Sequence, residues 1–150
     1  MTDILFYHLE RQPLERVLPS LLEKSLERGW RALVRTPSQD RVQVIDEMLW
    51  TSAEDGFLPH AMPGEPEAER EPILITALMD EPNHPHILFL VDGSALPDDV
   101  TVYERIVLLF DGNDEAALNL ARAAWKEVRA RGLDGTYWQQ NDGGRWEKKA

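Results

Sequence analysis

A basic and aromatic stripe near the carboxyl end is the part of the sequence best suited to bind another molecule. Its members recur at i, i+4, i+7 and i+11, with one cation alongside: Leu118, Arg122, Trp125, Arg129 and Lys126. That spacing lines one face of a helix. Guanidinium and ammonium groups hold carboxylates, and an indole offers flat apolar surface. The stripe therefore predicts a docking groove for an acidic peptide with an aromatic end. A solvated basic face with a half-buried Trp fits the same pattern.

Two aspartates are the candidates for catalysis. Asp92 and Asp111 each follow an apolar predicted strand, where metal-dependent hydrolases keep their carboxylates. An Asp-Gly pair after a strand is also ordinary turn chemistry. The chain lacks the phosphate-binding patterns G-x-x-x-x-G-K-[ST] and G-x-G-x-x-G. A metal-dependent hydrolase or nucleotide-binding enzyme using these two aspartates is the alternative to a binding module.

Other metal and nucleophile chemistry has little support in the residues. His84 and His86 lie close together but have no third ligand at a recognisable offset. The chain has no cysteine, which excludes disulfides, thiolate zinc sites and cysteine nucleophiles. We therefore expect no catalytic residue, no metal and no cofactor.

The elements that must position these residues alternate between strand and helix. Apolar runs predict strands over residues 4–9, 30–36, 73–78, 87–91, 105–110 and 136–139. Helical periodicity and capping residues predict helices from Pro13 to Gly29, from Ser38 to about Trp50, and from Asn113 or Asp114 to about Arg131.

This order predicts an α/β fold. It is a three-layer sandwich whose mostly parallel central sheet is flanked by helices, a nucleotide-binding-like topology without a P-loop. In the last helix, a core stripe of small and apolar residues should pack on the sheet: Ala117, Leu120, Ala121, Ala124 and Val128. Trp50 is a candidate for the wall of the groove opposite Trp125.

The length of 150 residues predicts a single domain, residues 1–150. Residues 51–72 are predicted to be a long acidic loop because Pro and Gly interrupt a run of Glu. Residues 143–150 are predicted to be a flexible tail. No apolar run approaches the roughly 18 residues of a membrane helix, and the amino end lacks a basic signal region. We expect a cytoplasmic protein without a membrane partner.

Charge is distributed unevenly along the chain. The net charge is −11, yet residues 117–150 carry seven Lys and Arg against four Asp and Glu. An acidic body repels a phosphate backbone, because nucleic-acid affinity comes mainly from clustered cations. We therefore expect any link to DNA to be mainly indirect.

Taken in order, several motifs carry a family resemblance. They are Phe6-Tyr7-His8-Leu9, Gly29-Trp30-Arg31-Ala32-Leu33-Val34, Asp46-Glu47-Met48-Leu49-Trp50, Phe57-Leu58-Pro59-His60, and Leu120-Ala121-Arg122 through Trp125-Lys126 with Arg129 and Gly132. On these residues the chain resembles the chi subunit of bacterial DNA polymerase III over most of its length.

The resemblance implies a non-catalytic accessory subunit of α/β fold. Chi subunits bind the acidic, Phe-ended carboxyl-terminal tail of single-stranded DNA-binding protein, and they attach to the clamp loader through a second small subunit, psi. The tail-binding positions of the family correspond here to Arg122, Lys126, Arg129 and Trp50, with Trp125 at a Tyr position and Leu118 where a basic residue can stand. The resemblance also makes four residues candidates for a supporting or partner-facing role: Phe57, Leu58, Pro59 and His60.

Overall fold

The computed structural model describes residues 2–10, 14–52, 60–61, 72–77, 85–94, 96–97, 99–140 and 145–149. Within them the chain forms eight strands and three helices. The strands are β1 (Asp3–Leu9), β2 (Ala32–Arg35), β3 (His60–Ala61), β4 (Ile73–Thr76), β5 (Ile87–Leu90), β6 (Arg105–Asp111), β7 (Asp134–Gln140) and β8 (Trp146–Lys148). The helices are α1 (Leu14–Glu27), α2 (Gln39–Ser52) and α3 (Glu115–Ala130).

All eight strands belong to one sheet in the order β3-β4-β2-β5-β6-β1-β7-β8. Every neighbouring pair is parallel except β7 and β8, which are antiparallel. The short inner strands β2, β4 and β5 are buried at every position, because helices or neighbouring segments cover both of their faces. The predicted, largely parallel sheet is confirmed.

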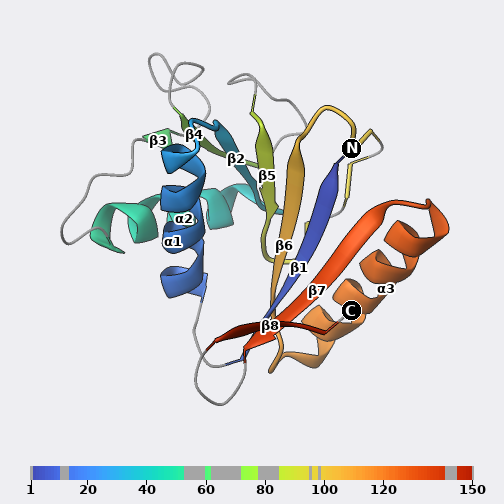
Figure 1. Cartoon of the computed structure of the whole chain (residues 1–150). Helices are drawn as coiled ribbons and strands as arrows, with labels where there is room; N and C mark the ends of the chain where they lie inside the picture. The colour runs from blue at the N-terminus through green and yellow to red at the C-terminus, as the bar shows by residue number, and fades with distance from the viewer. Residues whose placement is uncertain are drawn as a thin grey trace.

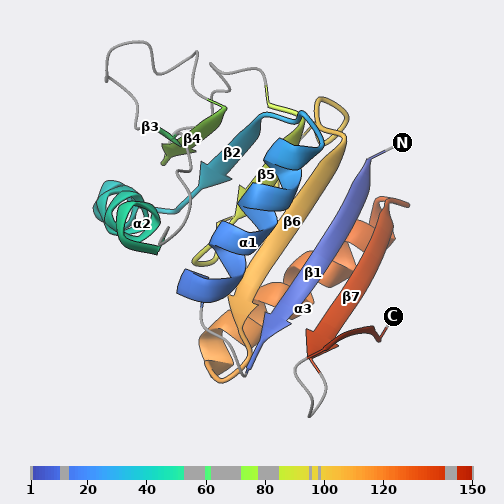
Figure 2. The ribbon, with the colours of Figure 1, turned by 60° about the vertical axis from the view of Figure 1, so that its left-hand side comes forward.

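Helices lie on both faces of this sheet (Figures 1 and 2). Apolar residues of α1 and α2 share a buried cluster with Val34, Phe89 and Val107 on one face. Ala121 and Val128 of α3 share a second cluster with Phe6 and other strand residues on the opposite face. The three-layer α/β sandwich predicted from the order of elements is therefore correct.

Two local predictions differ from the structure. The segment 143–150 was expected to be a flexible tail, but Trp146–Lys148 form β8 and pair with Trp138–Gln140 of β7. The Trp146 ring also packs edge-on against Tyr7, with centroids 4.8 Å apart. A nonlocal aromatic contact thus holds Trp146 in the sheet, which the local sequence does not indicate. Pro19 lies inside the helical pattern of α1 and predicts either a kink or a later start of the helix. The helix begins at Leu14 and continues through Pro19, so it does not start later.

The ends of α3 follow the predicted capping residues. Asp114 is the N-cap, and its carboxylate accepts a hydrogen bond from the backbone N–H of Ala116 at 3.0 Å. At the other end Gly132 has a φ of 69°, a left-handed conformation in which glycine carries no steric cost. The backbone N–H of Leu133 then reaches the carbonyl of Val128 at 3.0 Å, which closes a Schellman motif.

Candidate functional site

Helix α3 carries the predicted basic and aromatic stripe on the side of the molecule away from α1 (Figure 2). Arg122, Lys126 and Arg129 are exposed, whereas Leu118 and Trp125 are half-buried against the core. The cations thus reach solvent next to apolar surface, as the helical spacing predicts. We call these five residues the α3 stripe.

The Trp125 indole is held in a defined orientation by its neighbours. It meets Phe6 edge-to-face, with centroids 5.2 Å apart, and Tyr137 at 5.9 Å and 89°. The Arg129 guanidinium lies 5.9 Å from the centroid of the indole, within cation–π range. One aromatic ring and one cation are therefore positioned together before any ligand arrives.

Strand β7 adds two residues that the sequence reading did not assign to the site. Tyr137 is stacked on Phe6 and donates or accepts a hydrogen bond with His8 Nδ1 at 2.6 Å. Burial raises the pKa of Tyr137, an effect that the Arg122 guanidinium opposes and the Glu10 carboxylate reinforces. Arg122 therefore lies close enough to the phenol to influence its charge. The Gln139 amide beside it donates to Glu10 at 2.8 Å.

The Glu10 carboxylate is the acidic member of this neighbourhood. Its Oε1 lies 2.7 Å from His8 Nε2, an ion-pair distance without hydrogen-bond alignment, and also accepts the Gln139 bond. The sequence indicated this cluster of His8, Glu10, Tyr137 and Gln139 only by predicting a strand over residues 136–139. Which strand would lie next to β1 could not be read from a local pattern.

Trp50 belongs to α2, not to the helix that carries the α3 stripe. It lies in the last turn of α2, and α2 packs with α1 on the opposite face of the sheet from α3. The position of α2 does not favour the expectation that Trp50 forms the wall opposite Trp125, and that expectation stays a prediction. Phe57, Leu58 and Pro59 lie outside the described residues, and His60 belongs to β3, which pairs with β4.

Leu120 was expected in the core stripe of α3 but is 56% exposed. Its side chain lies on the flank of the helix that faces Gly93, where an added Cβ would lie 3.0 Å from Leu120 Cδ1. The i, i+3, i+4 spacing predicted that Leu120 would face the core. The buried residues of α3 are Ala121 and Val128.

Asp92 and Asp111 line one cavity of about 810 Å³ at the carboxyl edge of the sheet. Asp92 is ion-paired with Arg41, with Oδ2 2.8 Å from Nε and Oδ1 3.3 Å from Nη2. Asp111 accepts the backbone N–H of Asn113 at 2.9 Å, as in an Asx turn. The two carboxylates thus have turn and ion-pair roles, and the geometry gives the enzymatic alternative no support of its own.

Of the two candidate histidine ligands, His84 lies outside the described residues and His86 has a structural role. His86 accepts the backbone N–H of Arg31 at 2.9 Å through Nδ1 and stacks on Trp30, with ring centroids 6.5 Å apart. Across the residues that the structure describes, no group of three or more His, Cys, Asp or Glu is arranged to hold a metal ion. No helix in the same residues is long and apolar enough to span a membrane.

Comparison with known proteins matches nearly the whole chain. Residues 1–136 match the family model described as DNA polymerase III chi subunit, HolC. A curated relative, the probable DNA polymerase III subunit chi of Rickettsia prowazekii (strain Madrid E), is 22% identical over 117 residues. The aligned part covers 74% of this chain and 71% of the relative.

Proposed function

Because the chain belongs to the DNA polymerase III chi subunit family, we propose that it is a non-catalytic replication subunit that binds the carboxyl-terminal tail of single-stranded DNA-binding protein. The observation that carries the proposal is the α3 stripe, where three exposed cations and a half-buried indole share one helix face. An acidic peptide that ends in Phe complements both features.

In the proposed complex the carboxylates of the tail pair with Arg122, Lys126 and Arg129. The terminal Phe ring lies against Trp125 and Leu118, and Tyr137 takes the part that the sequence had suggested for Trp50. Charge-assisted hydrogen bonds contribute roughly 1.5–3 kcal/mol each when partly desolvated, and exposed ion pairs roughly 0.2–1 kcal/mol. A few such contacts with one aromatic contact correspond to micromolar binding, about −8 kcal/mol.

The acidic body of the chain contributes specificity. The first 116 residues carry 9 Lys and Arg against 23 Asp and Glu, so an acidic tail is repelled from most of the surface. As an extension of the proposal, the chain attaches to the clamp loader through psi, with Phe57–His60 as the candidate contact.

Titration calorimetry with an acidic, Phe-ended peptide tests the proposal. We expect micromolar binding by the parent and a loss of at least about tenfold for Arg122→Ala, because one charge-assisted contact disappears. The matched control is Arg16→Ala, which removes an exposed arginine from α1 on the other face. That variant should bind like the parent.

A second control changes the ligand. Removing the terminal Phe from the peptide should weaken binding to the parent, since the apolar contact with Trp125 is lost. Equal affinities for Arg122→Ala and the parent would reject the proposed site.

A further inference from the structure

The sheet has a second aromatic surface that the proposed function does not use. On the face opposite α3, α1 lies over the middle of the sheet, and none of the three helices in the described residues covers β1, β7 and β8 there (Figures 1 and 2). Tyr7, Trp138 and Trp146 lie on this open part and are half-buried. We call these three residues the aromatic sheet face.

Register shows that these rings share one side of the sheet. Tyr7 pairs with Trp138 across β1 and β7, whereas their neighbours Phe6 and Tyr137 pair and stack on the α3 side. Residues directly opposite in neighbouring strands point to the same face. In β8, Lys148 lies opposite Trp138 and Trp146 opposite Gln140, so both belong to the same side as Trp138.

Contacts within the sheet hold the three rings of the aromatic sheet face in place. Trp146 meets Tyr7 edge-to-face at 4.8 Å, and the Trp138 Nε1 donates to Thr136 Oγ1 at 2.9 Å. The indole N–H of Trp138 is thus satisfied within its own strand, and its ring does not need a polar partner from a ligand. Such rings act as rigid platforms.

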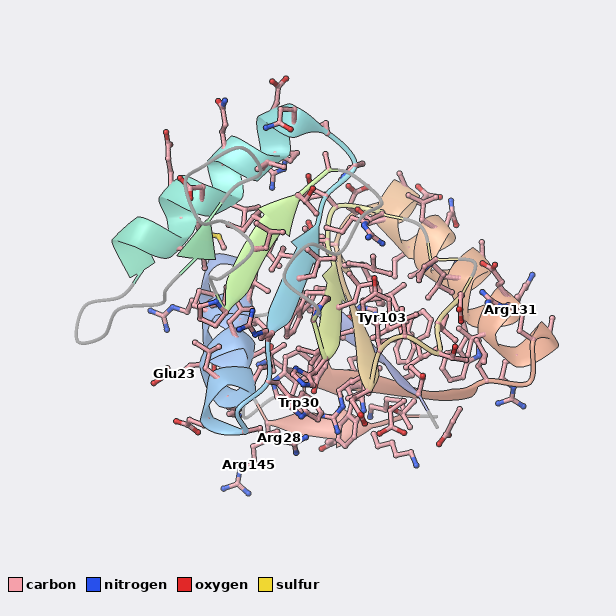
Figure 3. The ribbon with its side chains drawn as sticks, turned by 90° about the horizontal axis from the view of Figure 1, so that it is seen from above. Glu23, Arg28, Trp30, Tyr103, Arg131 and Arg145 are labelled. Carbon is pink, nitrogen blue, oxygen red and sulfur yellow. The ribbon has the colours of Figure 1, made fainter. Side chains whose placement is uncertain are left out.

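Cations surround the aromatic sheet face. Lys148 and Arg145 are exposed in and beside β8. Arg105, opposite Asp3 in register at the amino edge, is ion-paired with the Asp3 carboxylate at 3.8 Å. Arg28 and Arg105 lie 5.0 and 5.4 Å from the centroid of Trp30, which extends the cationic and aromatic character toward α1. In Figure 3 Arg28, Trp30 and Arg145 are labelled near one another, together with the acidic Glu23 of α1.

We propose that the aromatic sheet face binds single-stranded nucleic acid, with bases stacked on Trp138, Trp146 or Tyr7 and phosphates held by Lys148 and Arg145. An open sheet with aromatic side chains and flanking cations is suited to unpaired bases, since every base has a π face. Two acidic residues, Asp3 and Asp134, lie opposite each other in register at the amino edge of the strands. Phosphates therefore approach from the β8 side.

The strongly acidic composition of the chain limits the kind of contact that a nucleic acid can make. Broad electrostatic binding is excluded by the net charge of −11, so contact with a strand must be local and must rely on stacking. Two phosphate contacts predict a modest salt dependence, a slope of about −1.4 in log K against log salt concentration for a single strand.

Fluorescence anisotropy with a labelled oligodeoxythymidine of about 12 nucleotides tests this inference, a length that covers a typical site. We expect the parent to bind, Trp138→Ala to lose about tenfold or more in affinity, and Trp138→Phe to retain most of it. The Phe variant keeps an aromatic ring at the position, so it separates loss of stacking from loss of folding. Thermal melting of both variants checks that the fold is intact.

A pair of charge reversals separates this surface from the α3 stripe. Lys148→Glu should weaken oligonucleotide binding and leave binding of the acidic peptide unchanged, while Lys126→Glu should do the opposite. No oligonucleotide binding by the parent overturns the inference, as does equal weakening by both reversals. Self-association of the parent that Trp138→Ala abolishes, without oligonucleotide binding, would instead identify the surface as a contact between copies. Neither result bears on whether the peptide binds at Arg122.

Discussion

Gly112 shows how closely single residues are constrained around the α3 stripe. It follows β6, and its backbone N–H donates to the carbonyl of Leu9 at 2.6 Å. A Cβ at this position would overlap the imidazole ring of His8. That ring touches Phe110 and Tyr137 and contacts Glu10. The absence of a side chain at Gly112 is therefore required for the His8–Tyr137 pair to form.

We predict that Gly112→Ala destabilises the fold by about 1–3 kcal/mol, the usual effect of overpacking. His8→Ala removes the ring that the new methyl group would meet, so the same change should cost much less in that background. Urea denaturation of the parent, both single variants and the double variant measures the coupling. Additive losses would show that His8 is not the obstacle.

At the scale of the element, α3 is the platform on which the proposed tail site depends. Only Ala121 and Val128 are fully buried among its residues, so small inward side chains let the helix lie close to the sheet while the stripe stays at the surface. Its first turn depends on the Asp114 cap, which also places negative charge at the positive end of the helix dipole. The stripe residues begin one turn later, and Arg122 and Arg129 lie beyond the capped turn.

We expect Asp114→Ala to lower the free energy of unfolding by about 1 kcal/mol, because one backbone N–H loses its partner. Asp114→Asn keeps an accepting oxygen and should cost only a few tenths of that value. Urea denaturation measures both variants. Peptide affinity should remain within about twofold for each, since the cap does not touch the stripe. A destabilised Asn variant would argue against the capping role.

At the scale of the whole molecule, two tyrosines on opposite faces of the sheet link stability to alkaline pH. Burial raises the pKa of Tyr7, which Arg105 partly opposes, and burial likewise raises the pKa of Tyr137. A raised folded-state pKa stabilises the fold fully below the unfolded value near 10. The contribution is lost as pH rises through the folded value, because the unfolded chain releases its protons first.

The free energy of unfolding should therefore fall between about pH 9 and pH 11. In the double variant Tyr7→Phe and Tyr137→Phe this fall should be smaller, because Phe has no proton to lose. Urea denaturation across that range, with the parent measured in parallel, checks the difference. Parallel curves for the parent and the double variant would contradict it.

Local patterns predicted which segments form strands and helices better than they predicted which strands lie next to each other. Apolar runs identified the six longer strands, and capping residues bounded α3, because backbone preferences are encoded in adjacent residues. The strand order was not accessible in the same way, since it depends on contacts between distant segments. For this reason no local pattern places Tyr137 beside Trp125. The β8 pairing escaped notice for the same reason, as its stabilising contact with Tyr7 spans almost the whole chain.

Because successive side chains of β1 point to opposite faces of the sheet, two ligands could bind the chain at the same time. Phe6 supports Trp125 on one side of the sheet, and the next residue, Tyr7, supports Trp146 on the other. Occupants of the two sides would not compete, because a single layer of backbone separates them. A protein oligomer and the strand that it coats would then engage the chain bivalently, and the first attachment would raise the effective concentration of the second.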